Sequence, residues 1–166
     1  MKRLFSPWRS TYISSFKNES SDNACLFCSA AVSRKDAKNL LLLRRDTCFV
    51  MMNLYPYNSG HCMVIPYRHT PWLKELSKKE NAEIMDTTTL LMEALTKVMD
   101  PHGYNLGANL GRAAGAGIDQ HLHFHIVPRW NGDTNFMPTL ADVKLVSEDI
   151  RSTYRKLRRT LRTFDV

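Results

Sequence analysis

The stretch His-Leu-His-Phe-His-Ile-Val-Pro-Arg, residues 121–129, decides how this chain is interpreted. In an extended strand, successive side chains point to opposite faces. The alternation therefore predicts a strand over residues 121–128, with His121, His123 and His125 on one face and apolar side chains on the other. The apolar face suits a core, and the three imidazoles suit the lining of a cleft.

Three interpretations of this histidine face are open from the pattern alone. A half-buried strand has a polar face, but alternation does not account for the same residue three times. Alternate strand histidines can share one metal ion. One imidazole can also act as a covalent nucleophile while its neighbours orient it or bind phosphate. The segments on either side of the strand bear on the choice between the last two.

Both flanking segments carry groups that suit a nucleotide. Three glycines within residues 111–117 free the backbone to approach a ligand and to aim N–H groups at a phosphate. A plain flexible turn is the simpler alternative. After the strand, Arg129 offers a charge that matches phosphate geometry. Trp130 offers a flat face for a nucleobase, or alternatively fills a core or rim position.

The four cysteines predict one metal or redox site and two buried thiols. Cys25 and Cys28 have the spacing of a metal knuckle, which in a reducing compartment indicates metal or redox chemistry more than a disulfide. A tetrahedral site needs two further ligands, and His69 is a candidate. A reduced dithiol with a solvated His69 is the alternative. Cys48 and Cys62 lie in apolar runs and are expected to be buried and free.

The histidine stretch resembles the signature of the histidine-triad family of nucleotide hydrolases and transferases. Residues 53–66 resemble that family's nucleoside-binding segment. Residues 105–117 and 128–136 resemble one branch in particular, the bacterial diadenosine tetraphosphate phosphorylases of histidine-triad type. The likeness covers residues 5–163, which is nearly the whole chain.

This resemblance implies a reaction and a set of site residues. The reaction is cleavage of diadenosine tetraphosphate by inorganic phosphate, which yields ADP and ATP through an adenylyl-histidine and needs no organic cofactor. The nucleophile would be His123, with His125 on phosphate oxygens and His61 supporting the triad. The substrate-binding residues expected here are Asn53 at the ribose, Asn109, Gly115, Ala116 and Gly117 at the phosphates, and Arg129 and Trp130.

Two other functions stay open. A hydrolase of dinucleoside polyphosphates or nucleoside phosphoramidates is the main alternative. Hydrolase-type members often carry a glutamine and a hydroxyl residue shortly before the first histidine, whereas Gly117 and Ile118 stand here. That departure favours a phosphate acceptor over water. A nucleotide- or nucleic-acid-binding protein without this activity is the second alternative.

The resemblance also implies structural zinc. Many members with this cysteine pair bind zinc through both cysteines, a histidine that matches His69, and the first triad histidine, here His121. All four residues, Cys25 and Cys28 included, are present in this sequence. We therefore expect a closed zinc site that pins the N-terminal segment, residues 1–38, beside the sheet.

Periodicity predicts an α+β fold in a single domain spanning residues 1–166. Ser77 and Glu80 form a capping-box pattern, and the helix that follows should stop before Pro101. A C-terminal helix is expected over residues 142–163. The predicted strands cover residues 39–45, 47–54, 61–67, 104–110 and 121–128. The resulting five-stranded antiparallel sheet should carry its helices mainly on one side, and the resemblance implies a homodimer, with a tetramer as the alternative.

Composition fits a cytoplasmic protein without a membrane segment. The chain has 166 residues, 43% of them hydrophobic, which is ordinary for one globular domain. No apolar run approaches the ~20 residues of a membrane helix, and residues 1–7 lack the apolar core of a signal peptide. The net charge is +7, which would steer polyanionic nucleotides, but no separate nucleic-acid-binding module is visible. The excess positive charge is concentrated near the C-terminus, at Lys144, Arg151, Arg155, Lys156, Arg158, Arg159 and Arg162.

Overall fold

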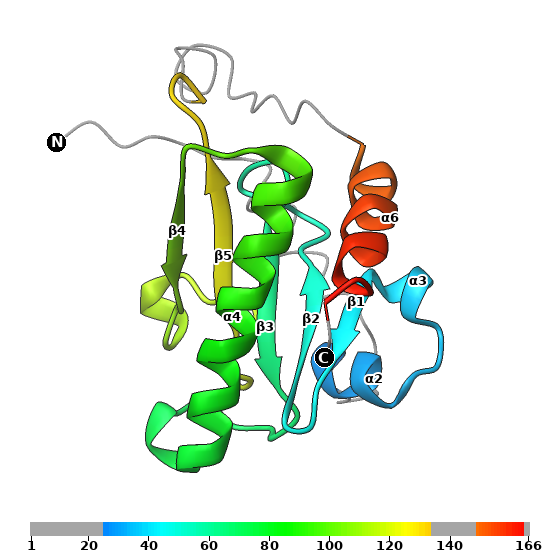
Figure 1. The fold of residues 1–166 in the computed structure, drawn as a ribbon. Coiled ribbons are helices and arrows are strands. Elements are labelled where there is room, and N and C mark those ends of the chain that lie inside the picture. The colour runs from blue at the N-terminus through cyan, green and yellow to red at the C-terminus, as the bar shows by residue number, and fades with distance from the viewer. Residues whose placement is uncertain (1–24, 134–148, 165–166) are drawn as a thin grey trace, which may run out of the picture.

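A computed structural model describes residues 25–133 and 149–164, and Figure 1 shows their arrangement. Five strands form one sheet in the order β1-β2-β3-β5-β4, and each neighbouring pair is antiparallel. The elements are α2 (Leu26–Val32), α3 (Asp36–Asn39), β1 (Leu41–Arg44), β2 (Cys48–Met52), β3 (Cys62–Pro66), the 3-10 turn η1 (Leu73–Glu75), α4 (Lys78–Met99), β4 (Gly103–Gly107), the 3-10 turn η2 (Arg112–Ala114), β5 (Phe124–Arg129) and α6 (Ile150–Leu161).

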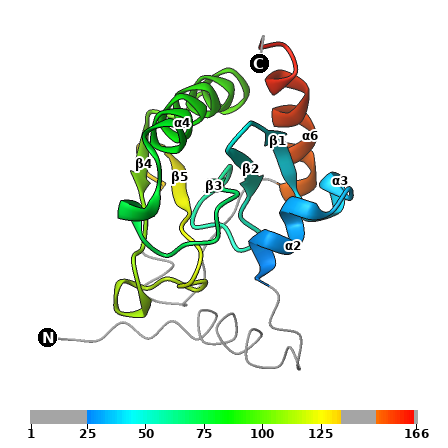
Figure 2. The same ribbon diagram turned by 90° about the horizontal axis from the view of Figure 1, so that it is seen from below.

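One face of the sheet carries the main hydrophobic core. Helices α4 and α6 pack on this face and against each other, as the view from below shows (Figure 2). The core includes Val50 and Val64 from the central strands, Leu91 from α4 and Leu157 from α6. The hydroxyl of Tyr154 also donates to the carbonyl of Leu41 at 3.1 Å, which ties α6 to β1.

The opposite face carries a smaller apolar cluster under the short helix α2. Phe27 of α2 packs there with Leu41, Phe49, Met51, Met63 and Ile65. Strand β2 is buried on both faces because its side chains alternate between the two clusters. The predicted α+β fold, with helices mainly on one side of five antiparallel strands, is confirmed.

Both ends of α4 follow from local chemistry. The Ser77 side chain accepts from the Glu80 amide at 3.2 Å, and the Glu80 carboxylate accepts from the Ser77 amide at 2.7 Å. This is the predicted capping box. At the other end, Asp100 adopts a left-handed conformation, and Pro101 follows it. The helix therefore stops where the sequence predicted.

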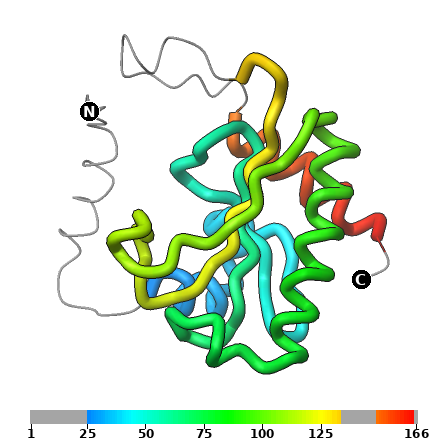
Figure 3. The backbone as a smooth tube through the Cα atoms, turned by 90° about the vertical axis from the view of Figure 1, so that its left-hand side faces the viewer, coloured from blue at the N-terminus to red at the C-terminus, as the bar shows by residue number. Residues whose placement is uncertain are grey.

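Each strand differs by one or more residues from its predicted range, and β4 and β5 differ most. Strand β1 begins at Leu41 and not at residue 39, because Asn39 ends α3. Strand β5 begins at Phe124, because the Leu122 amide donates to the Thr70 carbonyl at 2.7 Å and not to β3. Strand β4 ends at Gly107, and Figure 3 shows the following segment projecting beyond the sheet before the chain returns into β5. Helix α6 lies within the predicted range of 142–163, of which residues 142–148 fall outside the described part. Among the described helices none has the length and hydropathy of a membrane span.

Candidate active site and metal centre

Five of the six histidines of the chain gather on the sheet face covered by α2. Ring contacts of 4.8–5.0 Å join neighbours in this group, and Phe27 packs against two of its members. The five are His61, His69, His121, His123 and His125. The sixth, His102, is exposed and lies elsewhere, where its ring accepts from the Asn131 amide. The predicted histidine face therefore exists, and the segments on either side of β3 add His61 and His69 to it.

A backbone carbonyl fixes the tautomer of His123. The Nδ1 atom lies 2.8 Å from the carbonyl oxygen of His121, so Nδ1 carries a proton and donates it. The Nε2 atom then has a free lone pair, and it makes no hydrogen bond within the described part of the chain. Burial lowers the pKa of His123, which keeps the ring neutral near pH 7. A neutral imidazole with one bare nitrogen is the form that acts as a nucleophile.

A second chain of hydrogen bonds fixes the tautomers of His61 and His125. The Tyr57 amide donates to Nδ1 of His61 at 3.0 Å, so the proton of a neutral His61 is on Nε2. That Nε2 lies 2.9 Å from Nδ1 of His125 and donates to it. His125 must then carry its own proton on Nε2. This Nε2 is buried and has no hydrogen-bond partner among the described residues.

The unpartnered donor of His125 is held in the neutral state by its surroundings. Burial, with a smaller contribution from His123, lowers the pKa of His125 to about 4. A buried N–H without a partner costs free energy, and such groups in native structures call for an explanation. Oxygen atoms of a bound phosphate would satisfy this donor, whose ring packs against that of His123.

The remaining histidines meet the cysteine pair in a four-residue cluster. The ligand atoms of Cys25, Cys28, His69 and His121 all lie within 4.8 Å of one another. Nδ1 of His121 is 3.3 Å from the Cys25 sulfur and 3.2 Å from Nδ1 of His69, and the latter is 3.4 Å from the Cys28 sulfur. Bonds of about 2.0–2.3 Å around a tetrahedral ion give ligand separations of about 3.3–3.8 Å. The four predicted residues are therefore spaced to bind one metal ion.

The protonation of these residues also fits a metal ion. Nε2 of His121 donates to the Pro66 carbonyl at 2.9 Å, which leaves Nδ1 bare and facing the cysteines. Burial lowers the pKa of His121, so the ring stays neutral. Burial, followed by the nearby Cys25, raises the pKa of the Cys28 thiol. Two neighbouring thiolates repel each other, and a bound cation would offset this repulsion by stabilising both of them.

Five of the predicted substrate-binding residues lie in the chain segment before His61 or in the segment before His121. Asn53 follows β2, is buried, and its backbone amide donates to the His61 carbonyl. Its side-chain oxygen accepts from the Tyr55 amide at 2.9 Å. The half-buried Asn109 and the segment 115–117 belong to the loop that leads into His121. Gly115 has a φ of 89°, a conformation that side chains other than glycine rarely adopt.

The structure does not bring Arg129 and Trp130 to the histidines. Arg129 forms a two-point ion pair with Asp133, at 2.6 and 2.7 Å, and also donates to Asn105. The indole N–H of Trp130 donates to the Asp100 carbonyl at the end of α4. Arg129 lies four residues after His125 along one strand, a separation of about 13 Å. Within one chain, both side chains stabilise the turn after β5.

Comparison with known proteins places this site in a family. A model of the HIT domain matches residues 34–132. The AP-4-A phosphorylase of Mycobacterium tuberculosis strain H37Rv is 35% identical over 161 residues, which cover 95% of this chain and 83% of that protein. The chain belongs to the histidine-triad (HIT) family. The resemblance seen in the sequence is thereby confirmed at the level of the family.

Other histidine-triad proteins are similar over much of the chain. The adenosine 5'-monophosphoramidase hnt1 of Schizosaccharomyces pombe is 29% identical over 136 residues, 78% of this chain and 97% of that protein. The crystal structure of a Zn-bound histidine triad family protein from Mycobacterium smegmatis superposes with a TM-score of 0.66 at 26% identity. The superposed residues cover 84% of this chain and 94% of that protein's chain.

Two contacts of this histidine-triad site were not anticipated from the sequence. The Tyr57 amide, which fixes the proton of His61, is a main-chain group that carries no sequence signal. Phe27 lies between the two cysteines of the knuckle, and its ring packs against His121 and His123. An apolar residue inside a Cys-x-x-Cys pair was visible in the sequence. The two histidines that it contacts could not be predicted, because they lie about 95 residues away in the chain and only the tertiary fold brings them to Phe27.

The lowered pKa of His125 predicts a stability that falls with acid. The unfolded chain binds this proton near pH 6.5 and the folded chain only near pH 4, so stability is full above pH 6.5 and is lost between these values. Between pH 7 and pH 5 this residue should account for about 2 kcal/mol of lost unfolding free energy.

Urea denaturation at both pH values, at equal metal content, measures this loss. His125→Gln should reduce the pH dependence by about that amount, whereas the exposed control His102→Gln should keep the wild-type dependence. An unchanged pH dependence in His125→Gln would contradict the assignment of a buried neutral ring.

Proposed function

We propose that this protein cleaves diadenosine tetraphosphate with inorganic phosphate and releases ADP and ATP. The observation that carries the proposal is the bare Nε2 of His123 beside the buried, unpartnered N–H of His125. A nucleophile and a donor for phosphate oxygens, side by side and both neutral, suit nucleotidyl transfer through a covalent intermediate. The relationship to an AP-4-A phosphorylase supports this substrate.

In the first step, the Nε2 lone pair of His123 attacks the α-phosphorus of the substrate. The bond from that phosphorus to the oxygen of the β-phosphate breaks, ATP leaves, and AMP remains on Nε2. The ring gains positive charge in this step, and the His121 carbonyl, which accepts the hydrogen bond from Nδ1, stabilises that charge. The N–H of His125 donates to a phosphate oxygen as negative charge builds there.

In the second step, an oxygen of inorganic phosphate attacks the same phosphorus and displaces Nε2. The product is ADP, and His123 returns to its neutral form. Water in place of phosphate would give AMP, and the protein would then be a hydrolase. The small and apolar residues Gly117 and Ile118 before the triad support phosphate as the acceptor. The monophosphoramidase among the relatives keeps hydrolysis of a phosphoramidate as the second candidate.

We propose the following substrate contacts. Asn53 would bind the ribose, because it follows β2 and its backbone amide donates to the carbonyl of His61. Asn109 and the backbone of residues 115–117 would hold phosphates. Arg129 and Trp130 remain predicted ligands whose contacts in the single chain are to Asp133, Asn105 and Asp100.

We propose that the cysteine–histidine cluster binds structural zinc. A set of two thiolates and two imidazoles in tetrahedral reach suits Zn²⁺, and four protein ligands leave no open position for substrate. When bound, the ion would fix α2 beside the sheet. The free cysteines of the described chain are compatible with the reducing cytoplasm, where we place this protein.

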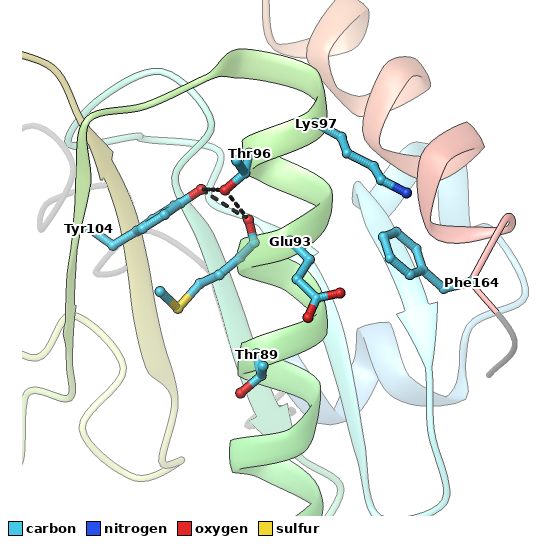
Figure 4. A pocket seen from close by; sticks show the side chains of 7 residues that line it. Thr89, Glu93, Thr96, Lys97, Tyr104 and Phe164 are labelled. Carbon is cyan, nitrogen blue, oxygen red and sulfur yellow. Dashed lines mark hydrogen bonds between the residues drawn. The ribbon is translucent and has the colours of Figure 1, made fainter.

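We further propose that the protein is a homodimer that pairs through β4 and α4. Strand β4 is an edge strand with Asn105, Leu106 and Gly107 exposed, and such an edge can pair with a second copy. Beside it, a mostly apolar groove of about 510 Å³ crosses the outer side of α4, with Tyr104 on one flank and Phe164 on the other (Figure 4). The groove is lined by Thr89, Met92, Glu93, Thr96, Lys97, Tyr104 and Phe164.

Product analysis tests the proposed reaction. With diadenosine tetraphosphate and phosphate we expect equal amounts of ADP and ATP, and no turnover without phosphate. His123→Ala should lower turnover at least about 1,000-fold, since the nucleophile is lost, while the control His102→Ala keeps wild-type activity. AMP and ATP formed without phosphate would assign a hydrolase. Full activity of His123→Ala would exclude the covalent mechanism.

Metal analysis tests the zinc site. The purified protein should contain one zinc per chain, and Cys28→Ser should lose it together with several degrees of melting temperature. Cys48→Ser is the matched control, because Cys48 is a buried free thiol outside the cluster. Wild type that binds no zinc when supplied with it would contradict the site.

Light scattering tests the dimer. Leu106→Lys places an unpaired charge in the proposed interface and should weaken dimerisation about 100-fold or more. Val32→Lys, an exposed position on α2, is the control and should leave the assembly unchanged. A monomeric wild type, or a Leu106→Lys variant that stays dimeric, would exclude this face.

A further inference from the structure

Phe27 connects the cysteine knuckle to the histidine that carries the nucleophilic nitrogen. It lies between Cys25 and Cys28 at the start of α2 and is 1% exposed. Its ring centroid is 5.0 Å from that of His123 and 5.4 Å from that of His121. An aromatic ring inside the knuckle therefore touches both a metal-cluster residue and the proposed nucleophile.

One hydrogen bond alone does not fix the orientation of the His123 ring. A single bond from Nδ1 to the His121 carbonyl leaves the ring free to swing about that contact. Phe27 limits this motion on one side, and His125 packs edge to face at 4.8 Å on another. These two contacts decide where Nε2 points, and attack on phosphorus is sensitive to that direction.

Two of the three restraints on His123 come from the cysteine–histidine cluster or from a residue next to it. The carbonyl that accepts the hydrogen bond from Nδ1 belongs to His121, whose side chain lies in the cluster. The aromatic contact belongs to Phe27, and the cluster residues Cys25 and Cys28 stand on either side of it in the chain. Order in the cluster therefore fixes two of the three groups that orient the imidazole.

We propose that Phe27 is a positioning residue that transmits the order of the cysteine–histidine cluster to the imidazole of His123. The proposal rests on the proposed function, because it assigns His123 the attacking nitrogen. In this role the cysteine–histidine cluster orients His123 in addition to anchoring the N-terminal segment. Loss of the Phe27 ring should loosen the nucleophile although all metal ligands and all triad histidines are retained.

Phe49 provides a matched control for this role. It is fully buried and belongs to the same apolar cluster as Phe27. Its one ring contact among the described residues is with Tyr67, at 5.3 Å, and it touches no imidazole ring there. Replacement of either phenylalanine by leucine removes a similar volume from one cluster. A purely structural role of Phe27 predicts that the two variants behave alike.

The test compares Phe27→Leu and Phe49→Leu in the zinc-loaded protein, below the melting temperature of both. Steady-state kinetics with diadenosine tetraphosphate and phosphate give kcat and KM, metal analysis gives zinc content, and ¹⁵N NMR of the imidazole rings reports the tautomer of His123. We expect unchanged zinc in both variants. We expect a kcat about 10-fold or more lower in Phe27→Leu alone, with KM unchanged and the ring-nitrogen signals of His123 shifted toward a mixture of tautomers.

Several results would overturn the proposal. Equal kcat values for the two variants, with unaltered His123 signals, would reduce Phe27 to a core residue. A raised KM with unchanged kcat would make it a substrate contact. If Phe27→Leu does not fold, Phe27→Met serves in its place with the same expectations. If wild type does not turn over the substrate, the proposed function fails, and the NMR comparison still decides whether Phe27 orients His123.

Discussion

Three main-chain groups decide which nitrogen of each imidazole carries a proton, and the chemistry of the site depends on that distribution. The Pro66 carbonyl accepts a hydrogen bond from Nε2 of His121, and the His121 carbonyl accepts one from Nδ1 of His123. The Tyr57 amide donates to His61, which in turn donates to His125. Identical side chains thereby acquire three different properties: a lone pair that faces the cysteines, a bare lone pair on Nε2 and a buried donor. The Pro66 carbonyl ends β3, Tyr57 lies between β2 and β3, and His121 precedes β5, so the sheet positions all three groups.

Burial makes this distribution persist near neutral pH. Desolvation lowers the pKa of His121, His123 and His125, so Nδ1 of His121 and Nε2 of His123 keep their lone pairs. Histidines buried in this way reduce acid stability, and the main hydrophobic core on the opposite sheet face supplies stabilisation. One sheet face carries the hydrophobic core and the other carries the histidines, because successive side chains of a strand point to opposite faces.

Sequence reasoning reached the parts of the molecule that obey local periodicity or known ligand spacing. It predicted the histidine face, the Ser77–Glu80 capping box and the meeting of Cys25 and Cys28 with His69 and His121, all of which the structure contains. It did not reach contacts that only the tertiary fold creates. The guanidinium of Arg129, a predicted substrate-binding residue, donates to Asp133 and Asn105 in the single chain. The contact of Phe27 with His123 likewise arises only when α2 folds onto the sheet.

We propose that His123, and neither His121 nor His125, carries the attacking nitrogen. The decisive experiment is mass spectrometry of protein mixed rapidly with diadenosine tetraphosphate in the absence of phosphate and digested without acid. We expect an added AMP on the peptide that contains the triad, with fragmentation that assigns it to His123 and ³¹P NMR that reports a phosphoramidate. An adduct on His121 or His125, or the absence of any adduct in a protein that turns over the substrate when phosphate is added, would contradict it.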